Sequence, residues 1–445
     1  MRIDSLTLKN FKKFSEYHLD LDPQFTLLIG DNSTGKTTLL DALAISAGVW
    51  LVNEPDSSLS TSKRNILTSE IRLEAVNSSG ITQFRECKPV EIRAEGWIDR
   101  QYYTWCRKIS LNGSRTSNTD AKEAIACITE LFNRDRQGEK IWFPVLAYYG
   151  AGRTWLPSNA SHKKAKLDRD LSRRWNAFYD CFEERIRLSD LQTWFQKEAL
   201  ATLQRNGKTR STYEVVKWAI LRCIPGADNL WFDADRAEIA ISIEGYVIPF
   251  SNLSAGQKMM VASIADIAIK SVTQNARFLP EFIDPDPTLL PSILEKTPGL
   301  VLIDEIDVHL HPKWQRRVID DLKSTFPSIQ FVCTTHSPQV IGQIQAKNLR
   351  ILYEDREGTP HVITPPQSWG MDSSWILQNL MGADARDINI EADLDKIFDE
   401  IDRENYSEAR QAIENLHNKV GDFPDLQEAT SFLDRLELLK QDETD

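Results

Sequence analysis

The chain has 445 residues, of which 41% are apolar and 27% are charged. These values are typical of a globular protein, and the length predicts one large elaborated domain or two lobes. No apolar run reaches the roughly 18 residues that a membrane span needs, and the first residues lack the apolar core of a secretion signal. We therefore expect a cytoplasmic protein, with its 6 scattered cysteines reduced.

Charge is distributed unevenly along the chain. The formal net charge is −12, but residues 391–445 contain 17 Asp or Glu against 6 Lys or Arg. Residues 153–222 instead contain 15 basic and 8 acidic side chains. The overall charge therefore says little about partners, whereas these two segments suit partners of opposite charge.

The first quarter of the chain alternates between strand and helix patterns. Residues 2–8 and 25–30 have the apolar patterns of strands, and residues 36–50 have the period of a helix. Between residues 65 and 110, alternating segments separated by short polar turns predict antiparallel strands.

Further along, residues 168–222 have a helical period, and residues 229–250 predict a meander of short strands. Five prolines between 278 and 299 indicate a segment that is mainly loop. The apolar runs within 299–305 and 330–336 are short and continuous, which is typical of buried strands.

The acidic tail carries two apolar stripes at helical spacing. We expect them to pack on each other as a helical hairpin, with the acidic surplus facing outward, where it suits a basic protein better than DNA. The stripes consist of Leu394, Ile397, Phe398 and Ile401, and of Ala429, Phe432, Leu433 and Leu436.

The clearest chemical motif is GDNSTGKT, from Gly30 to Thr37, between an apolar strand and a helix. Its glycines allow the backbone amides to curl around a polyphosphate, Lys36 can reach the outer oxygens, and the Thr37 hydroxyl can ligate Mg²⁺. A chance glycine loop would lack these flanks, so we interpret the segment as a phosphate loop.

Two acidic residues end the buried run GLVLIDE. Asp304 is placed to hold Mg²⁺, and Glu305 to face an attacking water. An apolar run before Asp-Glu is a weak signal alone, and the phosphate loop makes it strong.

His336 follows the next buried run and could donate a hydrogen bond to a terminal phosphate, although a single histidine there is more often structural. For His309 and His311 we favour a structural role, because no cysteine or third histidine lies near them in sequence. The segment SNLSAGQKMM, residues 251–260, is a second helix start that favours an anion.

The order of GDNSTGKT, LSAGQ, LVLIDE, IDVHLHP and TTHSP resembles the ABC-type ATPase heads of the SMC and RecF group. The opening LTLKNFKKF is similar to the first strand and turn of those heads. Within the group, AYYGAGR, HLHPKWQ and FPSIQFVCTTHSPQV resemble ATPases related to the overcoming-lysogenization-defect proteins, nearest to the PtuA-like ATPases of Septu and retron antiphage systems. The resemblance spans about residues 1–370.

This resemblance implies an α/β fold: an ABC-type P-loop ATPase head with a mixed core sheet, an antiparallel β subdomain, a helical lobe and a C-terminal helical tail. The expected divisions are 1–154 for the N-terminal ATPase lobe, 155–225 for the helical lobe, 226–370 for the C-terminal ATPase lobe, and 371–445 for the acidic tail.

By the same resemblance, the chain binds ATP and Mg²⁺, with Thr37 and Asp304 as metal ligands and Glu305, His336 and Lys36 as catalytic residues. The signature residues would approach the γ-phosphate bound by another subunit, and Asp307 would line that interface. The implied ATP contacts are Gly30, Asp31, Asn32, Ser33, Thr34, Gly35, Lys36, Thr37, Thr38, Lys12 and Lys13, and the signature residues are Ser254, Ala255, Gly256 and Gln257.

Two departures from the family pattern matter. Ala255 replaces the commoner second glycine of the signature, which is a mild change. The usual Mg²⁺-ligating glutamine is not assigned, and Gln137 and the Tyr148–Gly150 turn are the candidates. Slow hydrolysis, or ATP acting mainly as a conformational ligand, therefore stays open.

Partners are expected for this chain. No heptads sustain a coiled-coil arm, and residues 345–390 contain no acidic pair with the spacing of a nuclease, so we expect any cutting of nucleic acid to be done by another protein. The resemblance implies a homodimer or higher homo-oligomer through ATP and, in a PtuA-like system, an HNH nuclease as the separate effector, which we expect to dock on the tail. The basic stretch is a possible nucleic-acid footprint, but a solvated helix face is the favoured interpretation. Its residues are Lys163, Lys164, Lys166, Arg169, Arg173 and Arg174, with Trp175, Phe178 and Tyr179.

Three functions compete at this point. The chain could be a defence ATPase that regulates an effector, or a RecF-like repair ATPase that binds DNA through the basic stretch. A transporter subunit is disfavoured, because transporter heads are more compact than the long separation between Lys36 and Leu253 allows.

Overall fold

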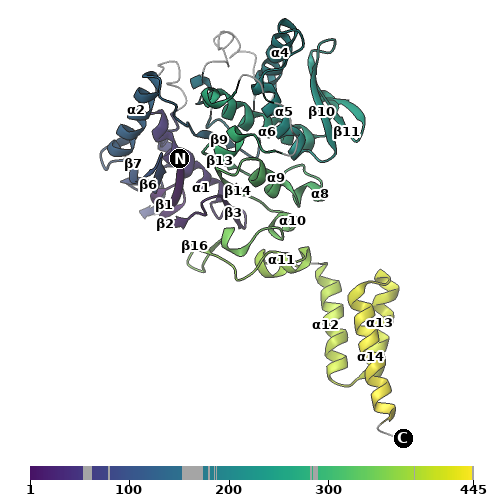
Figure 1. Cartoon of the computed structure of the whole chain (residues 1–445). Helices are drawn as coiled ribbons and strands as arrows, with labels where there is room; N and C mark the ends of the chain where they lie inside the picture. The colour runs from purple at the N-terminus through teal and green to yellow at the C-terminus, as the bar shows by residue number, and fades with distance from the viewer. Residues whose placement is uncertain are drawn as a thin grey trace. The chain divides into compact units, whose positions relative to one another are not determined.

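A computed structural model describes residues 1–53, 63–78, 81–152, 174–178, 181–184, 186, 188–280, 283, 289–384 and 386–442 (Figure 1). The chain divides into two compact units, Met1–Met371 and Asp372–Asp445. Among the helices within the described ranges, none combines the length and the apolar character that crossing a membrane requires.

A six-stranded sheet forms the centre of the first unit. Its inner strands are parallel, and β16 adds an antiparallel edge. β13, β14 and β9 are buried along their whole length, which explains their continuous apolar runs. In spatial order the strands are β16 (Pro360–Ile363), β15 (Leu349–Glu354), β3 (Phe25–Gly30), β14 (Ile329–Thr334), β13 (Gly299–Ile303) and β9 (Val145–Tyr149).

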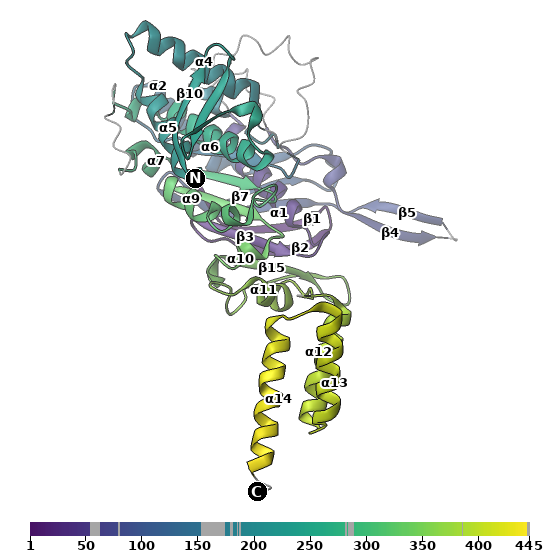
Figure 2. The same ribbon diagram turned by 90° about the vertical axis from the view of Figure 1, so that its right-hand side faces the viewer.

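A five-stranded antiparallel sheet forms a second layer. β6 alternates between buried and more exposed residues, as expected for a sheet with one face toward a core. A separate hairpin, β4 (Leu73–Ser78) with β5 (Ile81–Glu86), projects from this region in Figure 2. The strand order of the sheet is β2 (Phe14–Asp20), β1 (Arg2–Phe11), β6 (Val90–Ile98), β7 (Gln101–Ile109) and β8 (Ser117–Asp120).

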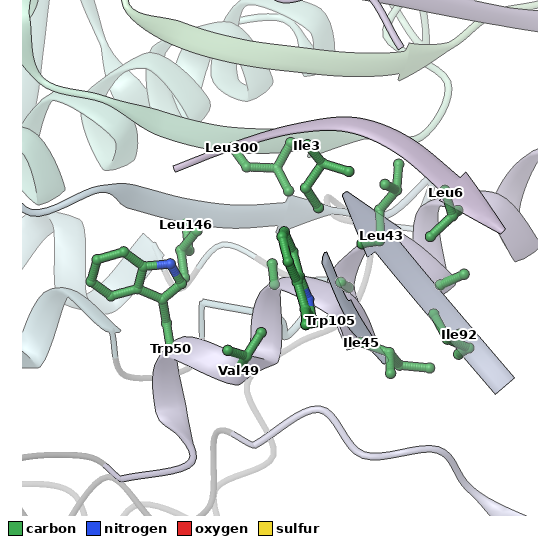
Figure 3. Close-up of a cluster of buried hydrophobic side chains, with 14 of the residues drawn as sticks. Ile3, Leu6, Leu43, Ile45, Val49, Trp50, Ile92, Trp105, Leu146 and Leu300 are labelled. Carbon is green, nitrogen blue, oxygen red and sulfur yellow. The ribbon is translucent and has the colours of Figure 1, made fainter. Parts of the chain in front are cut away.

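Helix α1 (Lys36–Ala47) lies in the core between these layers, and every residue from Leu39 to Ala47 is buried. Figure 3 shows Leu43 and Ile45 of α1 among side chains from both layers. The Trp105 indole donates to the carbonyl of Ser46 (3.1 Å), and the buried amide of Gln330 on β14 donates to the carbonyl of Ile3 on β1 (2.7 Å). Apolar packing and a few satisfied polar groups therefore hold the two layers together.

The end of α1 is closed by a buried cation. The Arg107 guanidinium donates to the carbonyl of Ile45 (2.7 Å) and to that of Arg64 (2.6 Å). Burial lowers the pKa of Arg107 to about 10. A cation at this position satisfies terminal carbonyls and opposes the negative end of the helix dipole.

A helical lobe and a small sheet complete the first unit. Helix α6 packs closely on α5, and the sheet has the order β10-β11-β12. The bounds are α2 (Lys122–Arg136), α4 (Leu188–Gln204), α5 (Ser211–Cys223), β10 (Ala227–Asp233), β11 (Glu238–Ile243), β12 (Tyr246–Pro249), α6 (Ala255–Gln274), α7 (Ser292–Lys296), α8 (Pro312–Gln315), α9 (Val318–Thr325) and α10 (Pro338–Ile341).

The basic stretch is only partly described. Arg174 begins a short 3₁₀ helix that ends at Phe178, and its guanidinium contacts the buried carboxylate of Asp135. Phe178 is fully buried, and Trp175 packs edge-on against the core rings of Phe132 and Phe143. These three residues therefore belong to the core. Lys163, Lys164, Lys166, Arg169, Arg173 and Tyr179 lie outside the described residues.

The second unit is a small helical bundle with its own core. Its core side chains come from α12, α13 and α14, so the expected hairpin is wrong in detail, because a third helix supplies Ala409, Ile413 and Leu416. Two stripe residues lie at its margin: Phe398 is 37% exposed and Phe432 is 45% exposed. The helices are α11 (Ser373–Leu380), α12 (Ile388–Asp402), α13 (Tyr406–Val420) and α14 (Pro424–Asp442).

The predicted strands at residues 2–8, 25–30, 229–250, 299–305 and 330–336 are confirmed, as is the helix that begins at Lys36. The mixed sheet, the antiparallel sheet, the helical lobe and the helical tail confirm the expected fold class. The proline-rich segment also contains α7, a short helix that the prolines had not led us to expect.

Candidate functional site

The carboxyl ends of three neighbouring parallel strands converge on one pocket. β3 leads into the phosphate loop, β13 ends before Asp304, and β14 ends before Thr335 and His336. Ligands of open α/β sheets bind at such carboxyl ends. The described residues that line the pocket are Lys12, Lys13, Asn32, Ser33, Gly35, Lys36, Thr37, Thr38, Asp304, Glu305, Thr334 and His336.

The glycines of the phosphate loop are required by its backbone. Gly30 has φ 142°, and a β-carbon there would lie 2.2 Å from the carbonyl oxygen of Leu352. Gly35 has φ 102° and would bring a β-carbon 2.5 Å from the ring of Phe14. The loop turns tightly into the start of α1, and neither position has room for a side chain, so both residues must be glycine.

Lys36 is held over this loop. Its ammonium donates to the carbonyls of Gly30 (2.7 Å) and Asp31 (2.9 Å), and the side chain is largely buried. Burial lowers the pKa of Lys36, although Asp304, Asp31 and Glu305 act against that shift. A cation fixed beside the first amides of a helix forms a site for phosphate.

Thr37 and Asp304 meet across the pocket although they are far apart in sequence. The Thr37 hydroxyl donates to Asp304 Oδ2 (2.9 Å), and the Thr334 hydroxyl donates to Asp304 Oδ1 (2.5 Å). Among the described residues, no group of three or more His, Cys, Asp or Glu side chains is arranged to hold a metal. Mg²⁺ needs no such group, because it binds through one or two protein oxygens, phosphate and water. The oxygens of Thr37 and Asp304 therefore fit this ion.

Glu305 and His336 both line this pocket. The amide of Glu305 donates to the Thr334 hydroxyl (2.7 Å), and Glu305 has φ 50°, which turns the chain sharply after β13. His336 is exposed and lines the pocket. This geometry can place a carboxylate near an attacking water and an imidazole near a terminal phosphate.

The two lysines of the first turn have different surroundings. Lys13 contacts the carbonyl of Ser33 in the phosphate loop and the carboxylate of Glu354. Lys12 instead pairs with Asp41 of α1 (2.5 Å) and lies 3.6 Å from Glu70. Both lysines line the pocket, but the charge of Lys12 is already paired with the carboxylates of Asp41 and Glu70.

The signature residues do not line the pocket of their own chain within the described residues. Ser254 is exposed and caps α6: its hydroxyl accepts from the amide of Gln257 (3.2 Å), whose side chain accepts from the amide of Ser254 (2.9 Å). This arrangement is a capping box, which satisfies part of the first turn of α6. The cap leaves the Ser254 hydroxyl proton and the amides of Ala255 and Gly256 without acceptors inside the helix.

Asp307 also lies outside the pocket lining, where its carboxylate accepts a hydrogen bond from the Thr335 hydroxyl. His311 caps α8, since its ring nitrogen accepts from the amide of Lys313 (3.3 Å). His309 has φ 61° and packs its carbonyl against Gly256. The geometry of both histidines is that of structural residues.

Neither candidate for the missing glutamine occupies the site. Gln137 is exposed at the end of α2, away from the pocket lining. Tyr148 is buried, and no hydrogen-bond partner of its hydroxyl is found among the described residues; the Tyr149 hydroxyl donates to Asp266 of α6 (2.7 Å). A β-carbon on Gly150 would lie 2.6 Å from a carboxylate oxygen of Glu184.

Sequence reasoning missed the two threonines before His336. Thr334 contacts Asp304 and Glu305, and Thr335 contacts Asp307. A usable signal was present, because Thr-Thr ends a strand whose neighbour ends in Asp-Glu, and adjacent strand ends meet at one edge of a parallel sheet.

Comparisons with known proteins point to ATPases. Residues 5–210 match the family described as AAA domain, and residues 273–342 match a second AAA-domain family whose description names the AbiEii toxin of a type IV toxin–antitoxin system. The chain is 26% identical to the Retron Ec83 probable ATPase of Escherichia coli, over 85% of this chain and 76% of that protein.

Two further matches are a partial match to a curated protein and a match to a solved structure. The chain is 30% identical to the Septu protein PtuA of Bacillus thuringiensis, over 55% of this chain and 61% of that protein. The SMC head domain from Thermotoga maritima aligns with a TM-score of 0.42 at 14% identity, over 82% of this chain and 99% of that domain. The chain is thus similar to the retron ATPases and to Septu PtuA, and these matches, together with its phosphate loop and mixed sheet, support an ATPase with a P-loop fold.

Proposed function

We propose that this cytoplasmic ATPase binds ATP–Mg²⁺ between two copies of the chain and that the resulting assembly regulates a partner effector, an HNH-type nuclease, in bacterial antiphage defence. Names of relatives from retron and Septu systems support the biological setting. The proposed mechanism depends on the residues of the pocket and of the signature.

The observation that carries the nucleotide site is the contact between Thr37 and Asp304 (2.9 Å), with Lys36 and Glu305 in the same pocket. Bound Mg²⁺ would lower the charge on the phosphates and polarise the bond to the γ-phosphate. Lys36 would hold the outer oxygens, Glu305 would accept a proton from the attacking water, and His336 would donate to the γ-phosphate. The remaining loop residues would contribute backbone amides.

The composite character of the site rests on where Ser254 lies. It is exposed and outside the pocket of its own chain, while the first turn of α6 keeps amides that suit an anion. A phosphate held by another copy satisfies those amides, and Asp307 would lie along the same junction. A two-fold arrangement then uses both signatures.

The test is to compare nucleotide-dependent assembly and turnover among matched variants. We expect wild type and Glu305→Gln to form a dimer with ATP, and Lys36→Ala and Ser254→Arg to remain monomeric, as measured by light scattering. If Ser254→Arg dimerised and hydrolysed ATP like wild type, the shared site would be wrong.

The effector would dock on the second unit. This bundle folds around its own core and carries the acidic surplus, and Asp395, Glu414 and Glu428 are exposed. Within the described part of the chain these three carboxylates form no ion pair, so they can attract a basic surface at long range.

Two changes test this docking. A chain that ends at Met371 should lose co-purification with a neighbouring HNH nuclease while it keeps ATP turnover. Replacing Asp395, Glu414 and Glu428 by their amides should weaken capture and reduce its salt dependence while the bundle stays folded. Unchanged capture in both variants would contradict docking on the tail.

A RecF-like repair ATPase that binds DNA directly is the alternative. Arg174, Trp175 and Phe178 are committed to the core, which removes them from any DNA-binding surface. Salt-dependent binding of duplex DNA by the chain without a partner would favour this alternative.

A further inference from the structure

The loop from Glu305 to His311 connects the phosphate site to the signature helix within one chain. Glu305 has φ 50° and His309 has φ 61°, so the loop takes a left-handed backbone at two residues that are not glycine. Such conformations persist only where surrounding contacts hold them. The contacts that do so are distributed along the loop.

Thr334 holds the first end of the loop. Its hydroxyl donates to Asp304 (2.5 Å) and accepts from the amide of Glu305 (2.7 Å). Its carbonyl accepts from the amide of Ile306 (2.9 Å). The end of β14 therefore fixes Asp304 and Glu305, the residues proposed to hold Mg²⁺ and to accept a proton from water.

Thr335 holds the middle of the loop. Thr335 is almost fully buried, and its hydroxyl donates to Asp307 Oδ1. The Thr335 hydroxyl oxygen also accepts a hydrogen bond from the amide of Ser337 (3.0 Å). One hydroxyl thus ties Asp307 to the segment that carries His336. A hydrogen bond to an ionised carboxylate is among the stronger ones in a protein.

Gln315 of α8 holds the far end. Its carbonyl oxygen accepts from the Ser337 hydroxyl (2.7 Å), and its amide nitrogen donates to the carbonyl of Leu310 (3.0 Å). The two ends of this side chain join the His336 segment to the last part of the loop. Any shift of one segment therefore displaces the other.

The loop then presses on the signature helix. A β-carbon on Gly256 would lie 2.2 Å from the carbonyl oxygen of His309, so two backbones are in direct contact. Ser254 lies two residues earlier and caps the same turn through Gln257. Since packed backbones deform little, a displaced His309 must move the Ser254 turn.

We propose that Thr335 and Gln315 are positioning residues, through which the phosphate site of one chain sets the place of the Ser254 turn that the same chain offers to its partner copy. This inference rests on the proposed composite site. It predicts that removing the Thr335 hydroxyl impairs hydrolysis of the nucleotide that the other chain holds.

Mixed assemblies test the proposal. One chain carries Lys36→Ala, so it supplies only a signature, and the other carries Ser254→Arg, so it supplies only a phosphate site. Different affinity tags on the two co-expressed chains allow the mixed assembly alone to be assayed for ATP turnover. Each parent should be inactive, and the mixed assembly should regain turnover.

Thr335→Val is then added to the Lys36→Ala chain. We expect turnover at the other chain's nucleotide to fall roughly tenfold, because a buried hydrogen bond to a carboxylate is lost. Thr335→Ser in the same chain should retain most of the turnover, since it keeps the hydroxyl. Equal turnover with valine and serine, in an active mixed assembly, would overturn the relay and leave the composite site intact.

An inactive mixed assembly would instead remove the composite site, and the relay with it. Thermal melting of the Thr335→Val chain reports whether the substitution simply unfolds it. If it does, Gln315→Met in the Lys36→Ala chain provides the same test, because this position is partly exposed at the end of α8. A loss of turnover with Gln315→Met supports the relay, and unchanged turnover contradicts it.

Discussion

Two helices in this chain, α1 and α6, begin with backbone amides that favour an anion, but the surroundings of the two helix starts differ. Helix α1 follows Gly35, has no side-chain cap, and begins inside the pocket. Helix α6 follows Ser254, which is exposed and closes a capping box with Gln257. Both leave amides that favour an anion, but only α6 satisfies part of its first turn by itself.

The difference suits the proposed composite site, in which one chain would supply a phosphate loop to one site and a signature helix to the other. The start of α1 is held in place by the tight phosphate loop before it. Gly30 and Gly35 have positive φ angles, which this tight turn needs. An exposed start has no such support, and a cap contributes about 1 kcal/mol against fraying. We infer that the cap of α6 keeps the Ser254 turn ordered until another copy presents a phosphate.

The largest expected effect is on ATP binding, from a substitution at Lys36, the first residue of α1. Lys36→Ala should weaken ATP binding about a hundredfold or more, because a charge-assisted contact to phosphate is lost. Equilibrium binding of a fluorescent ATP analogue measures it, with the exposed Lys347→Ala as the matched control. Comparable affinity in both variants would remove Lys36 from the phosphate site.

Glu305→Gln should separate binding from chemistry. The amide keeps the shape of the side chain but cannot accept the proton of water, so turnover should fall about a hundredfold or more while ATP affinity changes little. Steady-state hydrolysis and equilibrium binding check both parts, with the exposed Glu295→Gln as control. Unchanged turnover would show that another group activates the water.

Substitutions of Ser254 separate the cap from the phosphate contact. Aspartate caps a helix as well as serine does, so Ser254→Asp should leave the urea unfolding curve nearly unchanged, while its charge repels phosphate and lowers turnover roughly tenfold. Ser254→Ala should lower the free energy of unfolding by about 1 kcal/mol. If Ser254→Asp hydrolysed ATP at the wild-type rate, Ser254 would be a cap alone.

The smallest expected effects are on stability at the next two positions. Gly256→Ala should lower the free energy of unfolding by about 1–3 kcal/mol, because its β-carbon meets the His309 carbonyl at 2.2 Å. Ala255→Gly, its neighbouring control, should cost at most about 1 kcal/mol through backbone entropy. Urea unfolding measures both, and an equal loss in the two variants would argue against close packing of Gly256.

Local sequence determined most of the phosphate site. Gly30, Gly35, Lys36 and Thr37 act within one loop, so their spacing is sufficient to place them together. The short apolar runs before Asp304 and His336 likewise predicted buried strands, because period and length depend on neighbouring residues alone. The fold class followed from the family resemblance that these motifs carry.

Tertiary structure decided the contacts between distant segments. The pairing of Thr37 with Asp304 and of Thr335 with Asp307 depends on which strands are neighbours in the sheet. The ion pairs of Lys12 and Arg174 and the burial of Phe178 depend on tertiary contacts that no local pattern encodes, and the third helix of the tail joins its core for the same reason. Spacing along a chain specifies local conformation, whereas close packing selects which of many polar and apolar groups finally meet.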